Sequence, residues 1–396
     1  MEVKPGYKQT EVGVIPEEWE AKRLGDLASV TAGGTPSRTN SQYWNGDIPW
    51  VTTAEVDFCT INRAEQFITK EGLKDSAAKL LSRGTLLMAL YGQGKTRGKV
   101  GILGIEAATN QACAAISLNH GVFPDFIFHF LSGQYETIRK LSNTGNQENL
   151  NGTLVRSISV LTPPLPEQRA IATALSDVDG LLGGLDRLIA KKRDLKQAAM
   201  QQLLTGQTRL PGFRGEWEVK RLGDVVQIKK GQLITSSTLK PGDIPVIAGG
   251  KQPAYYHASA NRFGRTVTIS ASGASAGYVA LYDEPIFASD CSTISESESY
   301  CLAFVFYQLL CKQQVIYKAQ TGGAQPHIHA KDLNPIPFAF PPLPEQTAIA
   351  SVLTEMDAEL AGLEQRREKT RALKQAMMQE LLTGRTRLVS AESAYA

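Results

Sequence analysis

The sequence PLPEQRAIA at residues 164–172 occurs again, with one change, as PLPEQTAIA at residues 342–350. Downstream of each copy comes a second matched stretch, LKQAAMQQLLTG at residues 195–206 and LKQAMMQELLTG at residues 373–384. Matches of this length at a fixed order are typical of an internal duplication and not of two unrelated helices. The duplication therefore decides how the rest of the chain is interpreted.

A third match lies upstream of each pair. The sequence EWEAKRLGD at residues 18–26 returns as EWEVKRLGD at residues 216–224. Because the three matches follow one another in the same order in both halves, the chain contains two copies of one unit. Each copy has a leading segment, a variable globular part, a proline-rich connector and a long helical stretch.

The proline-rich connector predicts the start of a helix. Pro166 is suited to a first helical turn, where a backbone N–H has no partner inside the helix. Glu167 then lies near the positive end of the helix dipole, and Gly206 is favourable just past a helix end. We predict a helix over residues 166–204, and by the same reasoning a second one over residues 344–384.

Apolar residues of the first predicted helix recur mostly every three or four positions, which indicates one apolar stripe. Two such helices in one chain are expected to pair as an antiparallel coiled coil. Gly183 and Gly184 interrupt the middle of the helix and mark either a kink or a close approach. The stripe consists of Ile171, Leu175, Val178, Leu182, Leu185, Ile189, Leu195 and Leu203.

The variable parts have the short β-branched runs, bounded by glycine, that are typical of strands. Each is followed by one predicted helix, so each is expected to be a small α/β domain around a twisted mixed sheet. The predicted strands are residues 86–91, 100–103, 265–270 and 278–282, and the predicted helices are residues 126–141 and 302–318.

These elements predict an α/β (α+β) protein with a two-fold internal repeat, in which two small α/β domains are separated by two long antiparallel helices forming a coiled coil. The expected domains are residues 1–160 and 213–338. The expected helical regions are residues 161–212 and 339–396.

Composition excludes several classes of protein. The 396 residues are 42% hydrophobic and 20% charged, which is ordinary for globular domains. No apolar run reaches the roughly 18 residues of a membrane span, and the first residues do not resemble a signal peptide, so a cytoplasmic location is expected. The five cysteines form no CxxC pair and are expected to be reduced thiols. A net charge of +3 excludes a polycationic surface but leaves room for local basic grooves.

The repeated motifs resemble those of the specificity (S) subunits of type I restriction–modification enzymes. The residues that carry the resemblance are PPLPEQ at 163–168 and 341–346, the two LLTG helix ends, and the paired WExKRLGD segments. The segment from Thr321 to Ile328 also resembles a family loop, whereas the first half differs there, with NQEN at residues 146–149.

The resemblance implies a DNA-binding subunit without catalytic residues. Each variable part would be a target-recognition domain that reads one half of a split, asymmetric site in double-stranded DNA. The helices would space the domains and dock two methyltransferase (M) subunits, with restriction (R) subunits added outside. No cofactor would bind to this chain, because S-adenosylmethionine, ATP and Mg would belong to the partners. The docking helices are marked by Glu167, Gln168, Glu345 and Gln346.

In the first variable part we expect DNA contacts from a basic, glycine-rich hairpin and from a polar loop with aromatic neighbours. The hairpin resembles the end of a P-loop, but Ala89 stands where the first glycine would be, and nucleotide binding is disfavoured. The alternatives are a solvated turn for the hairpin, and a Trp44 that only caps the core. The candidate contacts are Gln93, Lys95, Thr96, Arg97 and Lys99 in the hairpin, and Thr35, Ser37 and Arg38 in the loop.

In the second variable part the corresponding loop is ASGASAG at residues 271–277, which is small and uncharged. Small residues permit close backbone approach to a groove, with neighbours supplying the charge. A plain strand-connecting turn is the alternative. His327 and His329 lack a third metal ligand nearby, so a surface or DNA-contacting pair is favoured. The candidate contacts are Ser272, Ser275, Lys251, Gln252, Arg262, Arg265 and His327.

Two other functions compete with DNA reading. The chain could be a scaffold whose two arms bridge partner proteins without touching DNA. It could also be a stand-alone enzyme, which the motifs disfavour. NPIP at residues 334–337 does not fit a DNA amino-methyltransferase motif, and no GxGxxG precedes a predicted helix.

Overall fold

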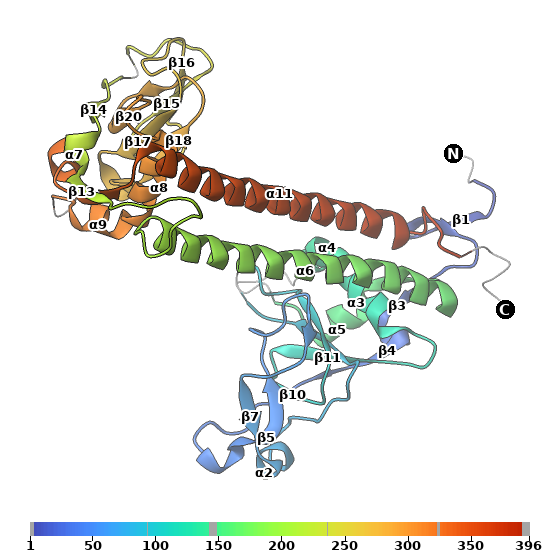
Figure 1. Cartoon of the computed structure of the whole chain (residues 1–396). Coiled ribbons are helices and arrows are strands. Elements are labelled where there is room, and N and C mark those ends of the chain that lie inside the picture. Colours follow the sequence, from blue (N-terminus) through green and yellow to red (C-terminus); the bar gives the residue numbers. More distant parts are fainter. Residues whose placement is uncertain (1–3, 93, 142–148, 236, 323–324, 390–396) are drawn as a thin grey trace. The chain divides into compact units, whose positions relative to one another are not determined.

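The computed structural model describes residues 4–92, 94–141, 149–235, 237–322 and 325–389. Within these residues no helix is long and apolar enough to cross a membrane. Figure 1 shows the course of the chain from the first globular part through the long helices.

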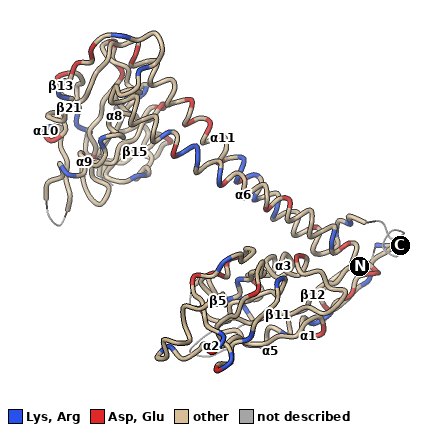
Figure 2. Tube along the Cα trace, turned by 60° about the horizontal axis from the view of Figure 1, so that its bottom comes forward, with Lys and Arg blue, Asp and Glu red and all other residues tan. Residues whose placement is uncertain are grey.

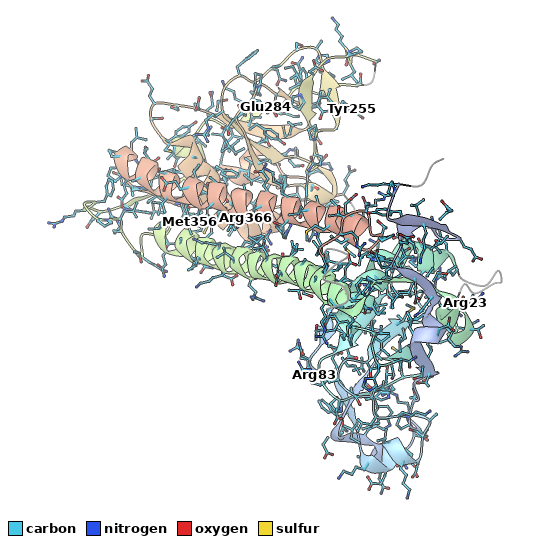
Figure 3. The ribbon with its side chains drawn as sticks, turned by 90° about the vertical axis from the view of Figure 1, so that its right-hand side faces the viewer. Arg23, Arg83, Tyr255, Glu284, Met356 and Arg366 are labelled. Carbon is cyan, nitrogen blue, oxygen red and sulfur yellow. The ribbon has the colours of Figure 1, made fainter. Side chains whose placement is uncertain are left out.

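The chain divides into two compact units, each of which takes one variable part together with one half of each long helix. Unit 1 comprises Met1–Gly184 and Arg367–Ala396, and unit 2 comprises Leu185–Arg366. Arg366, the last residue of unit 2, is labelled on the second long helix in Figure 3. The four ranges predicted above cut the chain differently and stay a prediction.

The two long helices are confirmed: α6 spans Leu165–Leu203 and α11 spans Leu343–Leu381. Gly206 and Gly384 follow their ends with φ of 73° and 70°, a backbone conformation that favours glycine. An added Cβ at Gly384 would lie 2.5 Å from Pro16, so this turn also requires the absence of a side chain.

The helices pair antiparallel within each unit, since later residues of α6 meet earlier residues of α11. In unit 2, Lys192 pairs with Glu359 at 2.7 Å and Lys196 pairs with Asp357. In unit 1, Lys374 pairs with Asp179 at 2.6 Å. Figure 2 shows charged residues of both signs along both helices. The coiled coil is thus held by ion pairs as well as by an apolar seam.

Two details of the predicted stripe differ. Leu195 is 48% exposed, whereas Leu185 and Ile189 are buried. The helix continues through Gly183 and Gly184, and a Cβ added at Gly184 would meet no atom within 4 Å. No close approach therefore requires a glycine at that position.

In the globular part of unit 1, a five-stranded mixed sheet has the order β4-β11-β8-β9-β6, in which β6 and β9 are parallel. A three-stranded sheet has the order β10-β5-β7, and β12 pairs with β3. The elements are β1 (Tyr7–Thr10), β2 (Gly13–Pro16), β3 (Glu20–Arg23), α1 (Leu24–Leu27), β4 (Ala28–Ala32), η1 (Ser41–Tyr43), β5 (Trp44–Val51), β6 (Thr60–Ile61), β7 (Gln66–Ile68), α2 (Lys70–Lys74), β8 (Leu86–Ala89), β9 (Val100–Leu103), β10 (Ala108–Thr109), β11 (Cys113–Leu118), α3 (Pro124–Gly133), α4 (Tyr135–Lys140), α5 (Gly152–Ser157) and β12 (Ser159–Thr162).

In unit 2 the central sheet has the order β14-β20-β17-β18 and is antiparallel throughout, so the prediction of a mixed sheet is wrong for it. The parallel pair lies in the smaller sheet, β16-β15-β19. The elements are β13 (Glu218–Arg221), α7 (Leu222–Val225), β14 (Lys229–Lys230), β15 (Ile244–Ile247), β16 (Tyr255–His257), β17 (Thr266–Ser270), η2 (Gly273–Ser275), β18 (Val279–Tyr282), β19 (Phe287–Ala288), β20 (Cys291–Ser295), α8 (Leu302–Cys311), α9 (Gln313–Lys318), α10 (Ala330–Leu333) and β21 (Pro337–Phe340).

The predicted strands are confirmed to within two residues, but the helix predicted after them is two helices in each unit. Gln134, with φ −92° and ψ 8°, separates α3 from α4, and Lys312, with φ −96° and ψ 16°, separates α8 from α9. These residues leave helical geometry, so α4 and α9 are short, separate elements.

A buried glutamate lies in the first turn of each long helix. An arginine that follows the C-terminal end of the other long helix neutralises this glutamate. Glu167 accepts hydrogen bonds from Arg387 at 2.6 and 2.8 Å and from the Trp19 indole at 2.9 Å. In unit 2, Glu345 accepts two hydrogen bonds of 2.6 Å from Arg209. The stretches after the two helices therefore close equivalent contacts in the two units.

A second repeated contact attaches each globular part to the helix pair. In unit 2, the Tyr307 hydroxyl donates to Asp357 at 2.8 Å, and Asp357 also pairs with Lys196. Tyr307 lies 3.3 Å from Thr354. Every member of this cluster has a hydrogen-bond partner.

In unit 1, histidine replaces the tyrosine in this contact. His129 is 1% exposed, and its Nε2 lies 3.0 Å from Ser176. Its Nδ1 makes no hydrogen bond and lies 3.9 Å from Asp179, which pairs with Lys374. Burial, followed by the nearby Lys374 ammonium, lowers the pKa of His129 to about 4, against the opposing effect of Asp179.

Unit 1 should therefore lose stability in mild acid. The folded state disfavours the protonated imidazole, whose ordinary pKa is 6.5. Its contribution to stability is complete above about pH 6.5 and is lost as the pH falls toward 4. We expect His129→Tyr, which installs the residue of unit 2, to lessen the fall in melting temperature between pH 7 and pH 5. Tyr307→Phe is the control, and an unchanged pH slope in His129→Tyr would contradict the expectation.

Removing Arg387 should destabilise unit 1. The Arg387→Met change leaves the Glu167 carboxylate buried without its two guanidinium hydrogen bonds, at a cost on the order of 3 kcal/mol. Urea unfolding would detect this as a lower midpoint for unit 1. Arg385→Met is the matched control, because Arg385 is 69% exposed and its ion pair with Glu380 is long, at 4.0 Å. Equal midpoints in the two variants would contradict the prediction.

Candidate nucleic-acid interface

One end of the central sheet of unit 1 gathers several of the predicted contact residues. At this end β8 finishes at Ala89, beside Cys113 at the start of β11. The loop of residues 90–99 leaves β8 here and returns to Val100 at the start of β9. Thr35 lies at the same end, because β4 finishes at Ala32.

Among the described residues of the predicted hairpin, Lys95 is the exposed basic side chain. Arg97 is only 7% exposed and donates to the Arg139 carbonyl at 3.5 Å, so its expected place at the surface is wrong. Lys99 is half-buried and pairs with Asp57 at 2.6 Å. Thr96 is half-buried, and Gln93 lies outside the described residues.

The polar loop after β4 is largely occupied by contacts within unit 1. The Arg38 guanidinium lies 3.9 Å from the Trp44 ring and donates to Gln66 at 2.8 Å. The Trp44 indole donates to the Ser37 carbonyl at 3.0 Å. Trp44 also packs edge-on against the buried Trp50, as its core alternative predicted.

Gln111 is a polar residue at this sheet end that sequence analysis missed, and it contacts Thr35. The Thr35 hydroxyl donates to Gln111, which lies two residues before β11 at the loop end of the sheet. Neither residue belongs to a recognisable motif, so only the strand pairing brings them together.

In unit 2 the equivalent sheet end is made by the end of β17, the start of β18 and the start of β20. Ser272 forms a β-bridge with His327, and its hydroxyl donates to Asp290. Lys251 extends over the Tyr278 ring, with 5.6 Å to the centroid. The structure therefore brings Ser272, His327 and Lys251 together, with Ser275 in the same loop and the exposed Gln252 beside Lys251.

The two arginines that were expected to supply charge to this end are used elsewhere. Arg265 lies at the opposite end of β17 and pairs with Asp283 at 2.6 Å. Arg262 donates to Thr293 at 2.8 Å and to the Lys230 carbonyl at 2.9 Å, which ties β14 to β20. Strand geometry separates Arg265 from Ser272, so Lys251 is the predicted basic residue found beside the loop.

Both loops are held by side chains that sequence analysis missed. In unit 1 these come from α4, where Tyr135 and Arg139 donate to the carbonyl groups of Lys95 and Gly94. In unit 2, Gln313 of α9 and Gln320, just beyond it, donate to the carbonyl groups of the second loop. The residue types differ between the units, so the repeat gives no signal for them.

Comparison with known proteins identifies the family. The family model for the type I restriction modification DNA specificity domain matches residues 16–189 and 214–371, which is most of the chain. The chain belongs to this specificity family.

Relatives within the family carry names that agree. The chain is 26% identical to the putative type I restriction enzyme MjaX specificity subunit of Methanocaldococcus jannaschii, over 96% of this chain and 97% of that one. It is 27% identical to the MjaIX specificity subunit of the same organism, but over only 57% of this chain and 55% of that one. It is 24% identical to the EcoR124I/EcoR124II specificity subunit of Escherichia coli over 48% of this chain and 46% of that one.

Two solved structures share the fold. The S subunit of a type I restriction–modification system from M. genitalium matches with a TM-score of 0.67 and 16% identity, covering 96% of this chain and 98% of that one. A chain from a study of type I R-M complex assembly and conformational transition matches with a TM-score of 0.59 and 19% identity, covering 94% and 99%. At these identities the likeness establishes the fold.

The four residues expected to mark the docking helices of this family member lie inside the units. Glu167 and Glu345 are 0% and 1% exposed, at the buried contacts described above. Gln168 accepts a hydrogen bond from the Phe123 amide, and Gln346 accepts one from the Cys301 amide. Each glutamine thereby fixes the connector to the start of α3 or α8. Docking of partner subunits on the helices stays a prediction. Exposed residues of the helices would have to make that contact, because these four residues are buried.

His327 and His329 stack with their ring centroids 6.3 Å apart. Across the described parts of the chain, no group of three or more His, Cys, Asp or Glu side chains could hold a metal ion.

The contrast between Lys95 and Arg97 can be tested directly. Arg97→Ala should lower the melting temperature of unit 1, because it removes a buried side chain at the base of the loop, at a cost of roughly 1 kcal/mol or more. Lys95→Ala should change stability by less than about 0.5 kcal/mol, because Lys95 is exposed. Thermal denaturation of both variants measures this, and equal melting temperatures would show that Arg97 lies at the surface.

Proposed function

We propose that this chain is the DNA-reading subunit of a type I restriction–modification complex, in which each globular domain reads one half of a bipartite, asymmetric site. The observation that carries the proposal is the repeated sheet end. The loop after β8 presents Lys95 in unit 1, whereas the loop after β17 in unit 2 carries Ser272, with His327 and Lys251 beside it. One frame with two different sets of polar groups suits two different half-sites.

The chemistry of these groups fits the two kinds of contact that DNA reading needs. Ammonium groups such as those of Lys95 and Lys251 contact phosphates, which fixes position and gives affinity. Hydroxyl and imidazole groups donate to or accept from base edges, which gives specificity. Ser272 and His327 supply both kinds of base-reading group at one place in unit 2.

The long helices are proposed to set the distance between the two half-sites. Each has 39 residues, which corresponds to ~58 Å at ~1.5 Å per residue. Two readers on one face of B-DNA must be separated by about one helical turn, ~34 Å, or a multiple of it. A pair of helices linked by ion pairs and an apolar seam is stiff enough for such a spacer.

Two methyltransferase subunits are proposed to dock on the helices, one at each unit. Unit 1 exposes Leu181 and Leu373 on its helical halves, at 43% and 56%, and unit 2 exposes Leu188 and Leu195, at 39% and 48%. Leu188 and Leu195 are one heptad apart on α6, a spacing that is suited to a partner helix. Restriction subunits would join outside them. Methyl transfer from S-adenosylmethionine and ATP- and Mg-dependent cleavage are proposed to belong to these partners, and this chain to be non-catalytic.

A scaffold that bridges partner proteins without touching DNA is the alternative. It predicts equal binding of the reconstituted complex to cognate and scrambled DNA. DNA reading predicts that binding depends on both halves of a split motif. The difference in polar groups between the two sheet ends favours DNA reading, because a symmetric scaffold has no need of it.

Methylation mapping tests the proposal. The full chain is co-expressed with its methyltransferase subunit, and methylated adenines or cytosines are located by single-molecule sequencing. The wild type should give a bipartite motif. Lys95→Ala and Lys251→Ala should each lower the fraction of motif sites that is methylated, because each variant loses a phosphate contact in one domain.

Lys22→Ala is the control, since Lys22 is exposed on β3 of unit 1, where β3 pairs with β12 and not with the strands that carry the loop. An active methyltransferase complex without a bipartite motif would overturn DNA reading in favour of the scaffold.

A further inference from the structure

In both domains, side chains of a short helix hold the loop at the sheet end, and in unit 2 a residue just after the helix does so as well. The short helix is α4 in unit 1 and α9 in unit 2. In unit 1, the Tyr135 hydroxyl donates to the Lys95 carbonyl, and Arg139 donates to the Gly94 carbonyl. Arg139 also donates to the Tyr135 hydroxyl at 3.0 Å, so the two side chains support each other. Both anchored carbonyl groups adjoin or belong to the exposed Lys95.

Unit 2 also holds its loop by side-chain hydrogen bonds to loop carbonyl groups, from different residues. Gln313 donates to the Gly277 carbonyl at 2.7 Å, and Gln320 donates to the Ala276 carbonyl at 2.8 Å. Gln313 is the first residue of α9, as Tyr135 is of α4, whereas Gln320 follows the helix. The side chain donates in each case, and the loop backbone accepts.

The floor beneath the two loops is also shared. Gly98 has φ of 83°, and a Cβ there would lie 3.6 Å from the Ile138 side chain and 3.1 Å from Arg139. Gly277 has φ of 77°, and a Cβ there would lie 2.9 Å from the Ile316 side chain. Each loop therefore packs on an equivalent isoleucine, of α4 in unit 1 and of α9 in unit 2. The close approach is possible because the loop residue at this contact is a glycine.

Such loops need an external anchor. Gly92, Gly94 and Gly98 all have positive φ, as do Gly273 and Gly277. Glycine has more backbone freedom than any other residue and loses more of it on ordering. The four side-chain donors restrict which of these conformations each loop adopts. A base contact requires that restriction, because its hydrogen-bond geometry is narrow.

We infer that Tyr135 and Arg139 in the first domain, and Gln313 and Gln320 in the second, are positioning residues that determine how accurately each loop reads its half-site. The inference rests on the proposed function. The residues of the anchor and the carbonyl groups they hold differ between the two domains. Each domain can therefore be perturbed separately, by residues that do not themselves have to touch DNA.

The test is a crosswise measurement on the full chain in complex with methyltransferase subunits. Methylation rates are compared between the cognate site and sites with one base changed in either half. Arg139→Ala should reduce discrimination at the half-site of the first domain by about tenfold, the size of one displaced base contact. Discrimination at the other half-site should stay as in the wild type. Gln320→Ala should give the converse.

Matched controls lie on the same helices. Lys140→Ala removes a positive charge from α4, and Gln314→Ala removes an exposed amide from α9. Both should leave discrimination unchanged. Tyr135→Phe removes one hydroxyl only and should lower discrimination at the first half-site less than Arg139→Ala does. It serves as the decisive variant if Arg139→Ala unfolds the domain.

A second readout separates the inference from the function it rests on. Amide hydrogen exchange of residues 90–99, measured without DNA, should become faster in Arg139→Ala and in Tyr135→Phe than in Lys140→Ala. Unchanged exchange would overturn the anchor even where a bipartite motif exists. Equal loss of discrimination at both half-sites would also overturn it. Faster exchange in a complex that never had a bipartite motif would leave the anchor standing and refute DNA reading.

Discussion

A carboxylate with almost no exposed surface stands at the start of each long helix, and the rest of the structure depends on how it is neutralised. Glu167 receives Arg387 and Trp19, and Glu345 receives Arg209 and Trp217. A buried charge without a partner would cost several kcal/mol, so these contacts must form for either unit to be stable. Each arginine follows the other long helix, which makes each unit depend on the end of a helix that begins in the other.

This dependence explains why the compact units do not follow the chain. The second half of α11 belongs with the first globular part, and the second half of α6 belongs with the second. The same rule places Lys374 beside His129 and Lys196 beside Tyr307. A histidine and a tyrosine can fill one position because both have an apolar ring with a polar edge. In unit 2 the Tyr307 hydroxyl donates to Asp357, whereas in unit 1 the Nδ1 of His129 has no hydrogen-bond partner.

The frame was predictable from the sequence and the site only in part, for one physical reason. Helices and strands are dictated by local patterns, and the repeat doubled each pattern, so α6, α11 and the four strands were expected nearly where they lie. The fate of a basic side chain depends on residues far along the chain. Arg97 is buried against Arg139, and Arg265 is taken up by Asp283, which no local pattern reveals. The anchoring residues differ in type between the copies, so the repeat could not point to them either.

The division of labour within each unit follows from these contacts. The residues that match between the two copies close the helix starts, hold the connectors and form the turns after the helices. Among those that differ are residues at the loop end of the sheets, where Lys95 in one copy corresponds to an uncharged stretch in the other. Substitution at that end changes no buried carboxylate and no strand pairing, and an exposed side chain there contributes little to stability. Because the frame carries the folding energy, the loops and their anchors can change in one domain without disturbing the other.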